Sequence, residues 1–276
     1  MSMGFRWAAG GIVSCALAMA TLQAQVPLQN EPLVDSIVRE CDLGKKQEYL
    51  EQWLAQEPQQ GTDVILDAAR RVLTDTPHDF AAQYTLVALM PWASRTTSEA
   101  MLLAARAAQA LLAEGIEIQF AAANRPASVS GKDWLEDRLR ALGITYRTLG
   151  WIAMLRGDHV VAEKHFLQSL EIYPNSPLVS AWLGKEVMAQ PGTAKMELAL
   201  FSFARAAGYE GDGALPDRAR RNLDEYLSKV YTAYTGTGDG LEALKEIAKT
   251  RPLPPSDLKI DSAEVRRFAD AGWNQR

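Results

Sequence analysis

The stretch YRTLGWIAMLRGDHVVAEKHFLQSLEIYP, residues 146–174, decides the fold of this chain. Its apolar residues recur at spacings of three and four, which predicts two helices, and the RGD at 156–158 predicts the turn between them. The stretch also holds two of the three histidines of the chain, His159 and His165. It is therefore either a catalytic or metal-binding helix or one unit of a repeated scaffold, and a recurrence of the pattern would favour the scaffold.

The pattern does recur, with a period of 34 residues or close to it. The first copy is marked by Leu149, Gly150, Ala162, Phe166 and Pro174, the second by Leu183, Gly184, Ala199 and Phe203, and the third by Tyr234, Gly238, Asp239, Ala243 and Pro255. The later part of the second copy is shifted by three residues, which the turn QPG at 190–192 can absorb. Small residues such as Gly150 and Gly184 are expected where two helices approach closely, and Phe166, Phe203 and Ile247 are expected to fill the adjacent gaps.

The period and the residue set resemble the tetratricopeptide repeat (TPR), a helix-turn-helix unit of 34 residues, over most of residues 46–257. The resemblance implies an all-α, right-handed solenoid of about five antiparallel helix pairs. Such a solenoid has a concave surface that binds peptides or protein segments.

The rest of the chain fits the same architecture. Helical periodicity predicts eleven helices, near 31–42, 46–57, 62–74, 79–91, 97–113, 132–156, 159–173, 177–190, 193–207, 217–235 and 240–250. Degenerate helical hairpins are expected over 26–114, a connecting loop over 115–131, TPR-like repeats over 132–257 and a C-terminal tail over 258–276. Ser130 is expected to cap the helix that follows it. The tail is either disordered or docks on the end of the solenoid through Phe268 and Trp273.

Residues 1–25 have the layout of a bacterial secretory signal peptide: one cation, Arg6, then an uncharged apolar run and small residues suited to cleavage. This predicts a periplasmic or secreted protein. The sequence IVSC, Ile12 to Cys15, also resembles the lipobox of bacterial lipoproteins, which gives the alternative of a membrane anchor through Cys15. Membrane contact is expected only in that case.

Composition and motifs argue against several other functions. The formal net charge is −5, so no basic field attracts phosphates and nucleic-acid binding is disfavoured. The sequence shows no phosphate-binding loop, nucleophile elbow, paired-cysteine metal spacing or dinucleotide turn. His159 and His165 are six residues apart and do not share a helical face. No catalytic residue, metal ligand or cofactor is therefore predicted, and the scaffold is favoured.

The TPR resemblance places a candidate binding face on the first helices of two successive units. It consists of Ile144, Arg147, Trp151, Met154 and Leu155, followed by Leu178, Ala181, Lys185 and Met188. The expected ligand is an apolar or acidic peptide, or a protein segment of that kind. The alternative for Trp151 and Met154 is that they pack against a neighbouring helix. The predicted function is an exported, non-catalytic binding scaffold in the cell envelope, and the alternative is a helical envelope enzyme that acts on cell-wall or peptide substrates.

Overall fold

The computed structural model describes residues 31–56, 61–93, 98–192, 195–211 and 213–263. The predicted signal peptide, Cys15, and Phe268 and Trp273 of the predicted tail lie outside these residues. The described part is helical and contains no strand, so the all-α prediction is confirmed for it.

Eleven α-helices follow one another along this part of the chain. They are α1 (Glu31–Arg39), α2 (Leu43–Gln56), α3 (Asp63–Asp75), α4 (Phe80–Leu89), α5 (Glu99–Gln119), α6 (Gly131–Leu155), α7 (His159–Ile172), α8 (Pro177–Met188), α9 (Met196–Gly208), α10 (Asp217–Thr235) and α11 (Leu241–Thr250). Two short 3₁₀ helices, η1 (Met90–Trp92) and η2 (Ala122–Asn124), follow α4 and α5.

The helix boundaries agree with the predicted ranges to within a few residues, with one exception. The predicted connecting loop over 115–131 begins too early in the sequence, because α5 continues to Gln119 and only 120–130 connect it to α6. The extra turns remain helical because Ile116 is fully buried and anchors them in the core. Ser130 caps α6 as predicted, its Oγ accepting a hydrogen bond from the backbone N–H of Asp133 at 3.1 Å.

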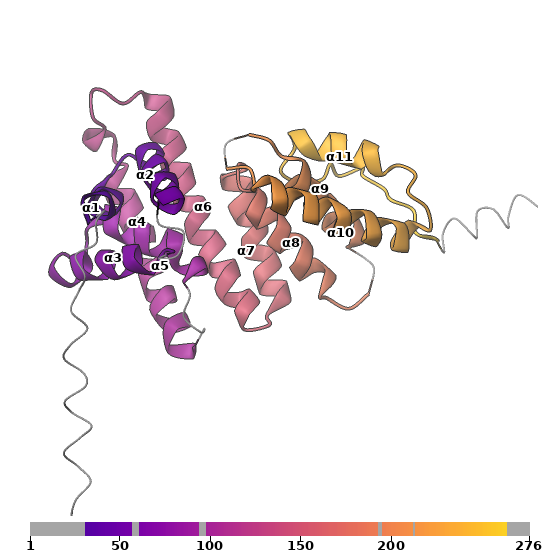
Figure 1. Cartoon of the computed structure of the whole chain (residues 1–276), viewed down its shortest axis with the longest axis horizontal. Helices are drawn as coiled ribbons and strands as arrows, with labels where there is room; N and C mark the ends of the chain where they lie inside the picture. The colour runs from indigo at the N-terminus through magenta and orange to yellow at the C-terminus, as the bar shows by residue number, and fades with distance from the viewer. Residues whose placement is uncertain (1–30, 57–60, 94–97, 193–194, 212, 264–276) are drawn as a thin grey trace, which may run out of the picture.

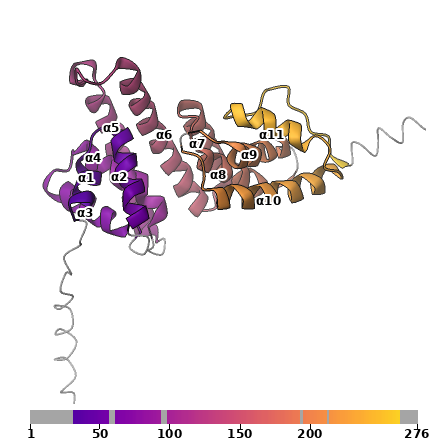
Figure 2. The same cartoon turned by 45° about the horizontal axis from the view of Figure 1, so that its top comes forward.

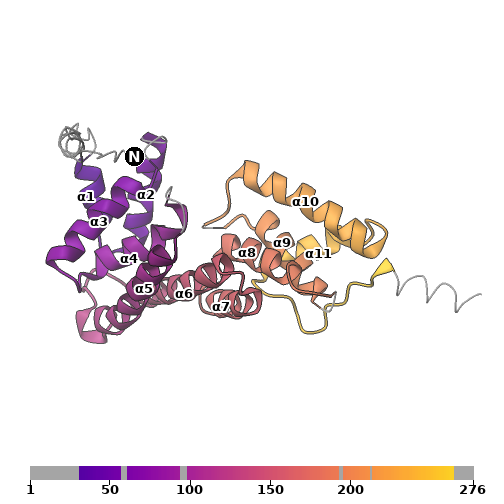
Figure 3. The ribbon, with the colours of Figure 1, turned by 90° about the horizontal axis from the view of Figure 1, so that it is seen from below.

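The helices pack mainly on their neighbours in the sequence, so the molecule extends from α1 to α11. Helices α1–α5 gather at one end and α8–α11 at the other, with α6 and α7 between them (Figures 1 and 2). Figure 3 shows α6 and α7 running along the base that joins the two ends. Helix α6 contacts α4 and α5 on one side and α7 on the other, which ties the two halves together.

Two glycines allow the close helix contacts that the repeat pattern predicts. A Cβ on Gly150 would lie 2.5 Å from ring carbons of Phe166, and one on Gly184 would lie 3.0 Å from those of Phe203. Both phenylalanines are buried. The α6–α7 and α8–α9 pairs therefore use the same device, in which an aromatic ring of the second helix packs on a glycine of the first.

The third predicted copy does not pack in this way. Ala243 and Ile247 of α11 are exposed, although the pattern assigned them to helix contacts. The buried residues of α11 are Leu241, Leu244 and Ala248, which lie on another face of the helix and join a core with α9 and α10. The prediction was wrong here because α10 and α11 both pack on α9, which turns α11 away from the orientation that the spacing implied.

Candidate ligand-binding pocket

A cavity of about 500 Å³ lies where the N-terminal helices meet α6, α7 and α8. The segment before α10, which includes Leu215 and Pro216, contributes a further wall. Most of the lining is apolar or aromatic: Ile37, Leu43, Leu50, Leu54, Tyr84, Ala88, Leu89, Trp92, Ile144, Tyr173, Pro177, Leu178, Leu215 and Pro216. The volume falls in the range of about 300–1,000 Å³ that is typical of pockets for small ligands.

Three cations also line this pocket: Lys46 from α2 and Arg140 and Arg147 from α6. Among the described residues that line it there is no aspartate, glutamate or histidine. The wall therefore carries positive charge in a mostly apolar surface, an arrangement that favours an apolar ligand with negative charge.

The ammonium group of Lys46 is fully used in hydrogen bonds within the protein. Its side chain is 4% exposed, and its Nζ donates to the carbonyls of Ile37, Val38 and Ala81 and to Thr85 Oγ1 at 2.8 Å. These bonds join the last turn of α1 to α4. Burial lowers the pKa of Lys46 to about 8.

Of the three cations, Arg147 has the positive charge that is least balanced by neighbouring negative groups. It is 8% exposed, Nη2 donates to the carbonyl of Ala88 at 2.6 Å, and the guanidinium lies 5.1 Å from the ring centroid of Trp92. Its Nε has no hydrogen-bond partner, and no ion pair joins it to a carboxylate of the described residues. Burial lowers its pKa to about 10, so the group stays protonated at neutral pH. The pocket therefore holds a buried guanidinium that no carboxylate of the described residues pairs with.

Arg140 differs because carboxylates stand beside it. Its Nη2 lies 4.0 Å from Glu136 Oε1, and its guanidinium lies 5.6 Å from the ring centroid of Tyr173. Asp137 is also close enough to interact with it electrostatically. Burial raises the pKa of Asp137 to about 6, although Arg140 acts in the opposite direction.

The structure brings together three residues of the predicted binding face. Ile144, Arg147 and Leu178 line the pocket. Trp151, 5% exposed, and Met154 instead pack into the core that α6 forms with the N-terminal helices, which is the packing alternative.

The other residues of the predicted face lie elsewhere. Leu155 is 39% exposed at the end of α6, and Lys185 is exposed on α8. Ala181 and Met188 are half-buried, and Met188 packs against the α9–α10 core. The sequence reasoning missed Lys46, Tyr84 and Trp92, which reach the pocket from distant parts of the chain and carry no motif. It also missed Arg140, which lies on α6 four residues before Ile144.

The histidines of the opening stretch make pairwise contacts. His159 Nδ1 lies 2.7 Å from Oε2 of the buried Glu186, and His165 Nδ1 lies 3.0 Å from Gln168 Oε1. Glu163, which shares a helical face with His159, instead pairs with Lys195 at 2.7 Å. No group of three or more potential metal ligands forms among the residues that the structure describes.

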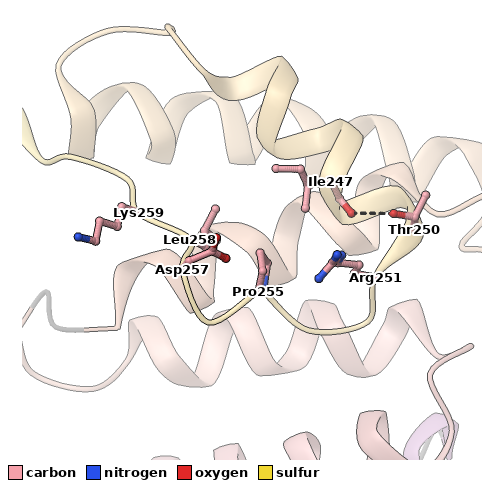
Figure 4. A pocket seen from close by; sticks show the side chains of 7 residues that line it. All are labelled: Ile247, Thr250, Arg251, Pro255, Asp257, Leu258 and Lys259. Atoms are coloured by element: carbon pink, nitrogen blue, oxygen red, sulfur yellow. Dashed lines mark hydrogen bonds between the residues drawn. The ribbon is translucent and has the colours of Figure 1, made fainter.

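A second hollow, of about 460 Å³, lies beside the end of α11 (Figure 4). It is lined by Ile247, Thr250, Arg251, Pro255, Asp257, Leu258 and Lys259. Figure 4 shows the side chains of Asp257 and Arg251 on either side of Pro255, and no aromatic residue takes part. Because it mixes both signs of charge, this hollow defines no ligand class.

No protein-family model matches the chain, no curated protein matches it, and no solved structure matches it. None of the helices in the described part combines the length and the apolar character that a membrane span requires. The described residues thus form an all-helical fold that contains an apolar, cation-lined pocket.

Proposed function

We propose that this protein is an exported TPR-like scaffold that binds a protein or peptide ligand in the cell envelope and performs no catalysis. In this proposal the helices form a right-handed solenoid of antiparallel pairs. The protein acts in the periplasm or outside the cell, or is held at the membrane through Cys15.

The observation that carries the proposal is the pocket. Three residues selected by the TPR resemblance, Ile144, Arg147 and Leu178, line it together, although they belong to two different helices. An apolar side chain of a partner segment would bury its surface against Leu178 and Ile144, and a neighbouring negative group would meet Arg147.

The helix packing supports the repeat architecture. The contacts of Gly150 with Phe166 and of Gly184 with Phe203 recur in two successive helix pairs. A contact repeated within each pair gives successive pairs the same close helix approach, and solenoids are built by stacking such similar units.

Affinity capture tests this function. The full-length, tagged protein is cross-linked in its own cells, and the captured proteins are identified for the wild type and for Leu178→Glu, which places a negative charge in the pocket wall. The matched control is Lys185→Glu, an exposed position on the same helix that does not line the pocket. The proposal expects one or two envelope proteins that Leu178→Glu loses and Lys185→Glu retains. Identical capture by all three proteins would contradict it.

A further inference from the structure

We infer that the pocket binds a small amphiphilic anion, an apolar chain that ends in one carboxylate, with Arg147 as the residue that pairs with the head group. The inference rests on the proposal that this pocket is the binding site of the protein. The inference goes beyond the proposed function because it names a class of small-molecule ligand.

The apolar part of the ligand is expected from the walls. Leu43, Leu50 and Leu54 of α2 face the same cavity as Ile144 and Leu178. Burial of an alkyl chain against these side chains is favourable because it removes apolar surface from water. Helices from both halves of the chain form the walls, and a volume of about 500 Å³ is in the range that accepts a small ligand of this kind.

The negative charge is expected from Arg147. Arg147 as a whole residue is 8% exposed, and the carbonyl of Ala88 is the one acceptor that the described residues give to its five N–H groups. A buried charge without a counter-ion is unfavourable, and a carboxylate would relieve this through charge-assisted hydrogen bonds.

The other two cations play a different part. The Nζ of Lys46 is already surrounded by acceptors, and Arg140 has carboxylates beside it. Both raise the positive potential in the pocket. Nε of Arg140 also has no hydrogen-bond partner, but Glu136 and Asp137 offset the charge of its guanidinium, whereas no carboxylate of the described residues is paired with Arg147. A single anionic group, rather than two, therefore matches the site.

A second buried arginine provides a matched control. Arg205 is 3% exposed, donates from Nη1 to the carbonyls of Ala248, at 3.2 Å, and Lys249, and its guanidinium lies 4.1 Å from the ring centroid of Tyr209. Its Nε also has no partner. Arg205 thus has the same kind of surroundings as Arg147 but does not line the pocket. A missing partner alone marks no site, and the inference depends on the cavity that Arg147 faces.

The test is calorimetric titration of the purified protein at neutral pH with decanoate, decanol and decylamine, which share a chain and differ in head-group charge. We expect decanoate to bind at least about tenfold more tightly than the other two, the factor for one charge-assisted contact. Equal affinities, or no binding of decanoate, would overturn the inference. This comparison uses the wild-type protein alone and stays decisive even where a variant does not fold.

Variants then locate the head group. Arg147→Met should lower decanoate affinity about tenfold or more, Arg147→Lys should retain part of it, and Arg205→Met should leave it unchanged. A folded Arg147→Met protein that binds decanoate like the wild type would refute the assignment.

The outcomes separate this inference from the proposed function. Decanoate binding without any captured protein would support the ligand class and count against the scaffold. Partner capture that depends on Leu178, without decanoate binding, would support the scaffold and overturn the ligand class.

Discussion

Replacement of Gly150 by alanine tests the helix contact on which the repeat interpretation depends. The added methyl group would lie 2.5 Å from two ring carbons of Phe166, well inside van der Waals contact. Phe166 is fully buried, so its ring has no open space into which it can move. Either the ring leaves its rotamer or α6 and α7 move apart.

The expected size follows from two opposing effects. Overpacking of a core costs about 1–3 kcal/mol, and the two short contacts place this substitution at the upper end. Alanine in place of glycine inside a helix stabilises the fold by about 1 kcal/mol, because its helix propensity is higher. The net loss in the free energy of unfolding is therefore about 2 kcal/mol. Gly184→Ala, whose Cβ would lie 3.0 Å from Phe203, should lose less, about 1 kcal/mol.

The assay is urea unfolding followed by circular dichroism at the helical band, with Gly131→Ala as control. Gly131 opens α6, and a Cβ there would meet nothing within 4 Å, so this variant should be as stable as the wild type or slightly more stable. The double variant Gly150→Ala/Phe166→Leu should recover part of the loss, with a coupling of at least about 1 kcal/mol. A Gly150→Ala protein as stable as the Gly131→Ala control would refute the reasoning.

Further predictions concern single contacts. Lys46→Met should destabilise the fold by about 2–4 kcal/mol in urea unfolding, because it leaves helix-end carbonyls without a donor. The pKa of Lys46 is lowered to about 8 in the fold and is ordinarily 10.5, so the native state binds fewer protons between these values. Stability should therefore gain from this group as pH rises from 8 to 10.5, by at most about 1.4 kcal/mol per pH unit, and Lys46→Met should lack the gain in the same titration. The pKa of Asp137 is raised to about 6, so its contribution to stability should fall as pH rises from 3.8 to 6, a dependence that Asp137→Asn should abolish in urea unfolding at several pH values. Ser130→Ala should cost about 1 kcal/mol and speed hydrogen exchange in the first turn of α6, with no change expected in α11.

Much of the helical framework could be predicted from the sequence. Except at the C-terminal end of α5, the spacing of apolar residues and the turn residues predict the helices within a few residues of their observed bounds, because both signals are local. The 34-residue spacing also located the glycines that the α6–α7 and α8–α9 contacts require. It failed for α11 because the face that a helix buries depends on its neighbours in space.

The pocket could be predicted only in part. Arg147 and Leu178 followed from the repeat pattern, whereas Lys46 and Trp92 are brought to the site by contacts between distant segments. The repeat pattern predicts Trp151 on the binding face, because its position on the first helix of a unit is one that faces the groove in TPR proteins. Trp151 is buried because α5 and the other N-terminal helices pack on α6. These contacts join segments that are far apart in the sequence, so the 34-residue period does not predict them.

Site-specific photo-crosslinking in cells tests directly whether the pocket beside Arg147 is the binding site. A photoreactive residue is placed at Leu178 in the pocket wall, and in a second protein at the exposed Lys185 on the same helix. We expect a discrete adduct from position 178 that disappears in the Arg147→Met background, and no such adduct from position 185. The same adducts from both positions, or an adduct at 178 that persists without Arg147, would contradict it.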